Sequence, residues 1–341
     1  MQFCSSHRIP LHVLPSSTDF KLSGFELPSP SNWPSAAAPS ASKQWDLGIV
    51  ASFGYLVPRG IIESFGDGMV NVHPSLLPQY VGSAPIPFAL LNGDRITGVS
   101  IIDVVPKLDG GPILAQNTLS IDDEETFRSL SAKLADLGGR SLCGVLSDLK
   151  RSRLRSVPQN EHEPQIKALY EAQRGGSKQS EFELIKTRKI QKGMSFIDWR
   201  LPAQRIVNRH RAIDGLLRNS RTVLGTKADT EKLLVLVDEV AVHRIHGNDP
   251  ITHSLCAEDE HHGVGSIAYC KHRDVLFVKC GRNEDGTPSL LAVRKLRIAP
   301  SLSSQHLATF DRFIEEFGHF LPFHDEQEYR TRIAPNLKNH F

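Results

Sequence analysis

Short apolar runs alternate with amphipathic stretches through the first 150 residues. The apolar runs are bounded by glycine or proline, which is typical of buried parallel strands. They predict strands at 9–14, 46–54, 69–73, 97–105 and 112–121, with short helices at 58–65 and 85–91 between them. A longer stretch with apolar residues at helical spacing and acidic residues at its start predicts a helix over 122–150. This alternation indicates an α/β layered domain over residues 1–150 with a mostly parallel sheet.

The pattern changes after residue 150. Residues 151–185 are polar and basic and predict a linker, and residues 202–213 predict a helix. Short β-like stretches separated by glycine follow, and they predict a small, OB-like β-barrel within a second domain at 186–320. These stretches lie at 222–224, 233–242, 265–268, 275–280 and 289–298. A last helix is expected at 303–317, before a frayed tail at 321–341.

Composition limits the class of protein. A chain of 341 residues with 23% charged and 40% hydrophobic residues is long enough for two globular domains. We find no apolar run near 18 residues, so we expect no membrane span. The five cysteines are scattered without a Cys-x-x-Cys pair, which argues against zinc, against a disulfide framework and for a reducing compartment. We read Glu260-His261-His262 as a polar surface loop and expect no metal, and the absence of Gly-x-Gly-x-x-Gly gives a nicotinamide cofactor no support.

The net charge of +2 hides an uneven distribution. Residues 150–227 carry 18 Lys/Arg against 7 Asp/Glu, whereas residues 1–149 carry 9 against 14 and the remainder carries 13 against 17. A basic middle suits a polyanionic partner such as a nucleic acid. A solvated linker explains the same charges, and charge alone does not separate these two interpretations.

Three polar residues at or just after the ends of predicted strands carry the candidate chemistry. Asn71 and His73 lie two positions apart on one predicted strand, so they share a face. An amide donor beside an imidazole can hold a developing oxyanion, and the imidazole can move a proton. Asp109, before two glycines, is the candidate carboxylate that fixes the imidazole. An isolated Asn-x-His would more often be a turn-capping pair, but the Ser75-Leu-Leu-Pro78 loop and the Asp-Gly-Gly motif favour a catalytic site.

The same segment resembles the folate-dependent formyltransferases. The resemblance is carried by Val50-Ala-Ser-Phe-Gly-Tyr-Leu-Val-Pro58, Asn71-Val-His-Pro-Ser-Leu-Leu-Pro78, Gly82-Ser-Ala-Pro85 and Leu108-Asp-Gly-Gly-Pro-Ile-Leu114. It continues at Ile197-Asp-Trp199 and Ile206-Val-Asn-Arg-His-Arg-Ala212, and it covers about residues 9–318. Within the family the sequence is most similar to the branch that formylates methionyl-tRNA, and to its mitochondrial type.

The resemblance implies an activity and a set of site residues. It implies transfer of the formyl group of 10-formyltetrahydrofolate to the methionine amino group of initiator Met-tRNA, by a mitochondrial enzyme (with the cytoplasm as the alternative) that we expect to be a monomer. Asn71, His73 and Asp109 match the family's catalytic residues, while Ser75, Leu76, Leu77 and Pro78 match its folate-contacting loop. The second domain would bind tRNA phosphates through basic residues on and before its helix, for which the candidates are Lys189, Lys192, Arg205 and Arg209.

The sequence departs from the family at its N-terminus. Family members begin with an additional strand, a helix and a further strand that have no counterpart here, so we expect a Rossmann-like sheet without its first strands. A truncated gene model, a short isoform or a fragment would each account for this. Two other hypotheses therefore stay open: a formyltransferase or hydrolase acting on a small amine or water, and a catalytically inactive product that binds RNA.

Overall fold

The described part of the chain divides into two compact units. The computed structural model describes residues 45–151, 154–173, 183–217, 220–226, 232–243, 255–256, 263–270, 273–298 and 317–321, with single residues at 4, 6, 7, 9 and 11. Unit 1 comprises Met1–Pro85, Arg95–Ile121 and Ala132–Arg188, and unit 2 comprises Ile86–Asp94, Asp122–Ser131 and Lys189–Phe341. Two short segments from the first half of the sequence thus belong to unit 2. The sequence pattern predicts instead that the two domains follow one another along the chain, with a linker between them.

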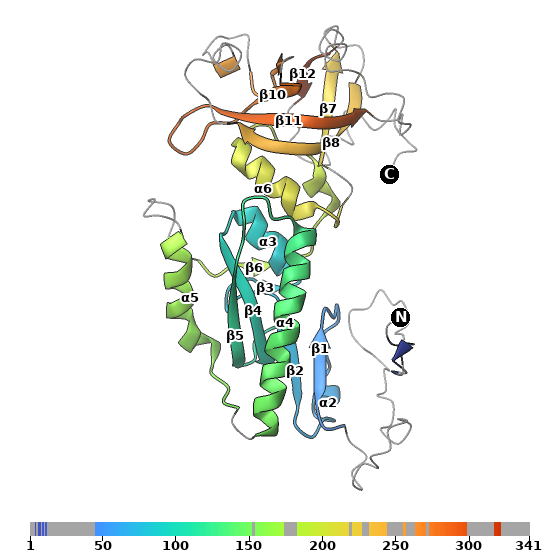
Figure 1. Cartoon of the computed structure of the whole chain (residues 1–341), viewed down its shortest axis with the longest axis vertical. Coiled ribbons are helices and arrows are strands. Elements are labelled where there is room, and N and C mark those ends of the chain that lie inside the picture. The colour runs from blue at the N-terminus through green and yellow to red at the C-terminus, as the bar shows by residue number, and fades with distance from the viewer. Residues whose placement is uncertain are drawn as a thin grey trace. The chain divides into compact units, whose positions relative to one another are not determined.

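Unit 1 contains a four-stranded sheet in the order β1-β2-β4-β5 (Figure 1). Its strands are β1 (Gly48–Ala51), β2 (Met69–His73), β4 (Ile96–Asp103) and β5 (Ile113–Ser120), and the short helix α2 (Arg59–Ile62) connects the first two. The β1–β2 pair is parallel, but β2–β4 and β4–β5 are antiparallel. The expected parallel arrangement therefore holds for one pairing of three. Residues 104–112, which connect β4 to β5, are too few for the helical crossover that a parallel pair needs.

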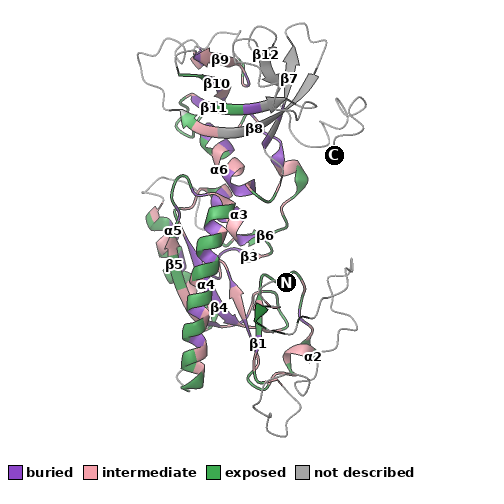
Figure 2. Cartoon of the chain, turned by 45° about the vertical axis from the view of Figure 1, so that its right-hand side comes forward, coloured by how far each residue is buried: buried purple, intermediate pink, exposed green. Residues whose placement is uncertain are grey.

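Helix α4 (Phe127–Lys150) packs against one face of this sheet (Figure 1). Gly138 allows the close approach, because a Cβ atom there would lie only 2.9 Å from Cγ1 of Val72 on β2. The helix alternates buried residues such as Leu130 and Leu134 with an exposed outer face (Figure 2). Val72 lies between Asn71 and His73, so α4 supports β2 from the face opposite to these two side chains.

A second helix lies inside the segment for which the sequence predicts a linker. Helix α5 (Gln159–Gln173) buries Ile166 and Tyr170 one turn apart. An isolated antiparallel bridge between Ile113 and Val157 joins the start of β5 to the residues before the helix. The chain then returns to pair β6 (Lys186–Thr187) with β3 (Val81–Gly82) in parallel. The described residues 154–173 and 183–187 are therefore part of unit 1.

Unit 2 is built on an antiparallel sheet and short helices. The sheet has the order β12-β7-β8-β11-β10-β9. Its strands are β7 (Ser220–Thr226), β8 (Lys232–His243), β9 (Ile267–Cys270), β10 (Val275–Cys280), β11 (Ser289–Ile298) and β12 (Phe317–Leu321). The helices of unit 2 are the 3-10 helix η2 (Lys192–Ser195), α6 (Ala203–Ile213) and α3 (Pro85–Asn92), of which all but Pro85 belongs to unit 2. Among the described strands no pairing joins β12 to β9, so the expected OB-like barrel is not confirmed.

The core of unit 2 forms where α6 packs on the sheet. Trp199 is fully buried there and donates a hydrogen bond of 2.8 Å from its indole nitrogen to Oγ1 of Thr222. The buried residue Arg211 donates from Nη1 to the carbonyls of Asp122 and Asp123, each at 3.1 Å. This contact explains why the residues that lead into α4 belong to unit 2.

The elements predicted from the sequence agree with the structure where the residues are described. Strands β2, β10 and β11 have the predicted bounds, and the other strands and helices predicted between residues 46 and 298 occur with shifted ends. Helix α5, the two-residue strands β3 and β6 and the 3-10 helix η2 are not predicted by the sequence pattern. Most of the predicted strand at 9–14 and most of the predicted helix at 303–317 lie outside the described residues. No described helix is long and apolar enough to cross a membrane.

Candidate functional site

Strand β2 places Asn71 and His73 at the end of the sheet of unit 1. Asn71 pairs with Ile102 of β4 and His73 with Ser100, so the two side chains point to the same face. Asn71 is half-buried, whereas His73 is only 4% exposed. The alternation predicted from the sequence is therefore present, with the imidazole as the deeper of the two groups.

Asp109 reaches the same place from the turn between β4 and β5. Its Oδ1 atom lies 3.5 Å from Nδ1 of His73, and its Oδ2 atom accepts a hydrogen bond of 2.9 Å from the backbone N–H of Gly82. The backbone of Asp109 is left-handed, with a φ of 45°, which is uncommon for a residue with a side chain. Gly111 permits this turn, because a Cβ atom there would overlap the Asp103 carbonyl. Gly111 is thus needed to bring the carboxylate to the imidazole.

Both ring nitrogens of His73 face acceptors. Nδ1 faces the Asp109 carboxylate, and Nε2 lies 3.1 Å from the backbone carbonyl of Tyr80. Burial lowers the pKa of His73, and this effect exceeds the opposing effects of the Asp109 charge and the Tyr80 carbonyl. A neutral ring can donate to only one acceptor at a time, while the protonated ring satisfies both. The imidazole is therefore poised to exchange a proton, and a substrate oxygen that takes its Nε2–H must compete with Tyr80.

The loop expected to contact folate is folded into unit 1. Ser75, Leu76 and Leu77 are fully buried, and Pro78 is half-buried. The Ser75 hydroxyl donates to the Gln79 carbonyl at 2.7 Å. Leu77 packs with Ile102 and Ile113. Of the four residues, Pro78 alone is open to contact with another molecule.

A hydrogen-bond network holds this loop, and the sequence motifs do not reveal it. The Ser100 hydroxyl donates to the Ser75 carbonyl at 2.7 Å and accepts from the Leu77 N–H at 3.0 Å. The Gln116 side-chain amide donates to the Leu77 carbonyl and to the Ser100 hydroxyl, each at 2.9 Å. These side chains come from β4 and β5, where they only appear as polar positions in a strand. The loop is therefore fixed to the sheet before any ligand binds.

The basic residues proposed to contact tRNA differ in their surroundings. Lys189, Lys192 and Arg205 are exposed on unit 2. Arg209 is half-buried and donates from Nε to the Met194 carbonyl at 2.7 Å, and burial lowers its pKa. Arg205 and Arg209 thus lie one helical turn apart, but only Arg205 is fully available to a polyanion.

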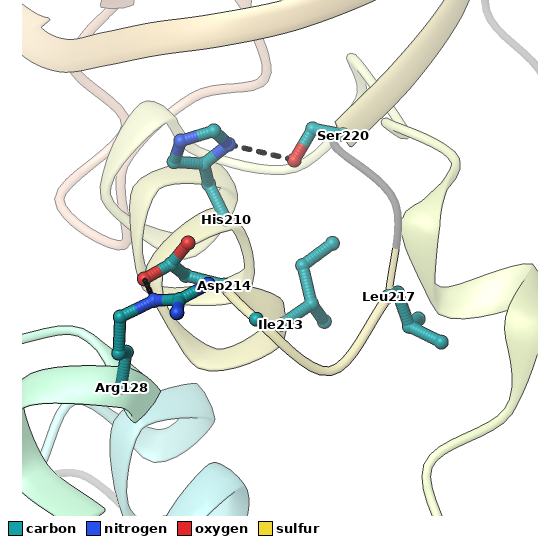
Figure 3. Close-up of a pocket in the computed structure, with 7 residues that line it drawn as sticks. Arg128, His210, Ile213, Asp214, Leu217 and Ser220 are labelled. Atoms are coloured by element: carbon teal, nitrogen blue, oxygen red, sulfur yellow. Dashed lines mark hydrogen bonds and ion pairs between the residues drawn. The ribbon is translucent and has the colours of Figure 1, made fainter. Parts of the chain in front are cut away.

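A small polar cavity in unit 2 was not indicated by any sequence pattern. It measures about 180 Å³ and is lined by Arg128, His210, Ile213, Asp214, Gly215, Leu217 and Ser220 (Figure 3). His210 and Ser220 are hydrogen-bonded at 2.8 Å, and Arg128 lies 3.9 Å from Asp214. With both signs of charge on its walls, the cavity indicates no ligand class. Elsewhere in the described residues no group of three His, Cys, Asp or Glu side chains is placed to hold a metal.

Two family models match the chain. Residues 15–146 match the formyl transferase domain, and residues 189–300 match the formyl transferase C-terminal domain. The chain belongs to the formyl transferase family. The first match contains the buried His73–Asp109 pair and the second contains α6 and most of the antiparallel sheet of unit 2.

Similar proteins carry the name methionyl-tRNA formyltransferase. One from Nitratidesulfovibrio vulgaris is 39% identical over 140 residues, which is 40% of this chain and 42% of that protein. The mitochondrial one from Homo sapiens is 31% identical over 270 residues, which is 77% of this chain and 59% of that protein. The chain thus spans between about two fifths and three fifths of the length of these relatives.

Solved formyltransferase structures are more distant. The sugar 3N-formyl transferase WlaRD, crystallised with dTDP and 5-N-formyl-THF, is 15% identical with a TM-score of 0.45, and 72% of this chain and 71% of that chain are covered. HypX from Aquifex aeolicus, in complex with tetrahydrofolic acid, is 16% identical with a TM-score of 0.43, and covers 74% of this chain and 36% of that chain.

Proposed function

We propose that the chain transfers the formyl group of 10-formyltetrahydrofolate to the methionine amino group of initiator Met-tRNA. The observation that carries this proposal is the buried His73–Asp109 pair at 3.5 Å, on the same face as Asn71, within a matched formyl transferase domain. The relatives named methionyl-tRNA formyltransferase support tRNA as the acceptor. So do three exposed cations of unit 2: Lys189, Lys192 and Arg205.

The reaction exchanges one carbon–nitrogen bond for another. The neutral amine attacks the formyl carbon on N10 of the folate, and the carbonyl oxygen becomes an alkoxide. Collapse of this intermediate re-forms the carbonyl and breaks the bond to N10. The attacking amine loses one proton and N10 gains one, so the products are formylated Met-tRNA and tetrahydrofolate.

Each of the three residues has a defined task in this scheme. Asn71 and His73 donate N–H groups to the alkoxide, which is stronger as an acceptor than the starting carbonyl. His73 gives up the Tyr80 carbonyl as partner when it binds that oxygen. Asp109 stabilises the protonated imidazole and orients it, and it collects the amine proton directly or through a water. Pro78 and the backbone beside it line the place of the folate.

The remaining assignments follow from this function. The antiparallel sheet of unit 2 is the core of an OB-like tRNA-binding barrel. The protein acts as a monomer. It acts in mitochondria, for which the similarity to the human mitochondrial enzyme over 77% of the chain is the support.

A formylation assay tests the proposal. Purified chain is incubated with 10-formyltetrahydrofolate and aminoacylated initiator tRNA, and formylmethionine is measured after the ester is hydrolysed. Free methionine, an amino sugar nucleotide and water serve as competing acceptors. Formylation of Met-tRNA alone supports the proposal. Faster transfer to a small amine or to water assigns a different acceptor, and salt-dependent tRNA binding without transfer in this chain and in a longer product of the same gene indicates an inactive RNA-binding protein.

A further inference from the structure

The turn that carries Asp109 is held from outside the sheet by a single side chain. The amide nitrogen Nε2 of Gln159 donates to the Asp109 carbonyl at 2.6 Å and to the Gly111 carbonyl at 2.8 Å. The two hydrogens of one amide group suffice for both bonds. They span the left-handed residue and fix the carbonyls on either side of Gly110. A left-handed backbone at a residue other than glycine persists only where its surroundings hold it.

We propose that Gln159 is a positioning residue, which holds the turn of Asp109 so that its carboxylate stays beside His73. Both hydrogen bonds of the Gln159 amide go to main-chain carbonyls, so Gln159 acts on the carboxylate through the backbone of Asp109. The carboxylate is then held at two points, by Gln159 through its own main chain and by the Gly82 N–H at its Oδ2 atom.

The same segment also holds the other side of the imidazole. Tyr170 of α5 packs edge-on against Tyr80, with ring centroids 6.3 Å apart, and the Tyr80 carbonyl faces Nε2 of His73. The backbone N–H of Ile185 donates to the side chain of Gln79 at 2.7 Å, next to Tyr80. Gln159 and Tyr170 of α5, together with Ile185, therefore contact both loops that face His73. Gln159 is the member of this segment whose side chain is committed to the carboxylate's turn.

The pKa of His73 reports how close the Asp109 carboxylate lies to the imidazole. Asp109, from the β4–β5 turn, is the charged group that acts on the imidazole, and the Tyr80 carbonyl faces its other nitrogen. The Asp109 charge favours the protonated ring. A turn that moves away from His73 removes part of this effect, so the pKa of His73 falls further. This readout needs neither folate nor tRNA.

The test compares two glutamines on the same helix. Gln159→Met keeps the length of the side chain and removes its donors. Gln173→Met is the matched control, because Gln173 is also half-buried and bonds a backbone group of unit 1, the N–H of Arg95, at 2.8 Å. We expect Gln159→Met to lower the pKa of His73, followed by NMR of the imidazole in the full chain, by roughly 0.5–1 unit. We expect Gln173→Met to leave it unchanged.

The kinetic arm rests on the proposed formyl transfer. Gln159→Met should reduce kcat by roughly 10–100-fold with little change in KM for folate or tRNA, because misplacing a catalytic group affects the transition state. In an Asp109→Asn background the same substitution should have no further effect, since Gln159 acts through Asp109. If Gln159→Met does not fold, Gln159→Asn replaces it, because its shorter stem cannot reach both carbonyls.

Three results would overturn the proposal. They are an unchanged His73 pKa in folded Gln159→Met, an equal shift in Gln173→Met, and an undiminished kinetic effect of Gln159→Met in the Asp109→Asn background. Absence of formyl transfer by the unsubstituted chain contradicts the proposed function instead, and the NMR titration then still decides whether Gln159 positions Asp109.

Discussion

His73 and Asp109 are the residues on which the proposed chemistry depends. Removing either side chain leaves in place the hydrogen bonds by which Ser100 and Gln116 hold the Ser75–Pro78 loop. We expect His73→Ala and Asp109→Ala each to lower turnover at least about a hundredfold, the scale of a lost oxyanion donor or a lost acid–base group. Folate binding, measured by calorimetry, should be retained. His162→Ala on α5 is the control and should keep full turnover; a His73 or Asp109 variant that stays active would remove these residues from the mechanism.

The buried imidazole also links stability to pH. Because burial lowers the pKa of His73 in the folded state, the unfolded chain binds this proton more tightly. The stability that neutral His73 contributes is present above the unfolded pKa of about 6.5 and is lost as pH falls towards the folded pKa. The free energy of unfolding should therefore drop below pH 6.5, by at most about 1.4 kcal/mol per pH unit from this group.

Urea unfolding at pH 7.5, 6.5 and 5.5 measures this dependence. His73→Asn is the matched variant, because it cannot take up the proton while every other histidine is kept. The difference in unfolding free energy between the two proteins should shrink, or change sign in favour of the variant, as pH falls. A constant difference across this range would show that His73 titrates alike in both states.

At the scale of one element, α4 shows how neighbouring glycines can have opposite effects. Gly138 faces β2, and a Cβ atom there would lie 2.9 Å from the stiff side chain of Val72. Gly139 is exposed, with nothing within 4 Å of such an atom. We expect Gly139→Ala to stabilise the protein by about 0.5–1 kcal/mol, since alanine favours the helix. Gly138→Ala should destabilise it by about 1–3 kcal/mol through overpacking.

Thermal and urea unfolding of the two variants check this pair. Gly138→Ala should also reduce turnover, because Val72 lies between Asn71 and His73 and moves with them. Stabilisation by both alanines would mean that α4 does not press on β2. Equal loss in both would indicate instead that this part of α4 is not a regular helix.

The elements also show what the sequence pattern can and cannot reveal. Strand β2 is predicted with its bounds because apolar residues alternate up to Pro74. Helix α5 is missed because its buried stripe consists of only Ile166 and Tyr170 and because Pro164 lies inside it. Its short stripe is sufficient because Tyr170 packs on Tyr80 and because the chain just before the helix bridges to Ile113, contacts that depend on tertiary structure. The antiparallel pairing of β2 with β4 is likewise a property of the connection, not of the strand's own residues.

The candidate site, too, contains residues that the sequence predicts and residues that only the structure reveals. Motif and side-chain alternation predict that Asn71, His73 and Asp109 belong together, and the structure brings His73 and Asp109 to 3.5 Å. The residues that hold them, Tyr80 and Gln159, act through a backbone carbonyl and a side-chain amide. Such contacts leave no periodic or compositional signal. They can be found only once the loops are placed in space.

At the scale of the whole molecule, the charge distribution bears on the proposed partner. Residues 150–227 carry 18 Lys/Arg against 7 Asp/Glu in a chain whose net charge is only +2. Part of this charge is already engaged: Arg200 pairs with Asp198 at 2.7 Å, and Arg209 donates to a backbone carbonyl. The exposed cations that remain available to a polyanion include Lys189, Lys192 and Arg205. A phosphate contact should therefore depend on Arg205 more than on Arg209.

Salt titration of tRNA binding tests whether Arg205 contacts a phosphate. Each phosphate contact releases counterions and contributes roughly 0.7–0.9 to the slope of log K against log salt. Arg205→Ala should weaken binding and reduce this slope by about one contact. Arg59→Ala is the control, since Arg59 is an exposed helical arginine outside the basic segment, paired with Glu63 at 2.6 Å. An unchanged slope in Arg205→Ala, or an equal change in Arg59→Ala, would show that the charge of the basic segment acts only as a diffuse field and that α6 does not contact the phosphates.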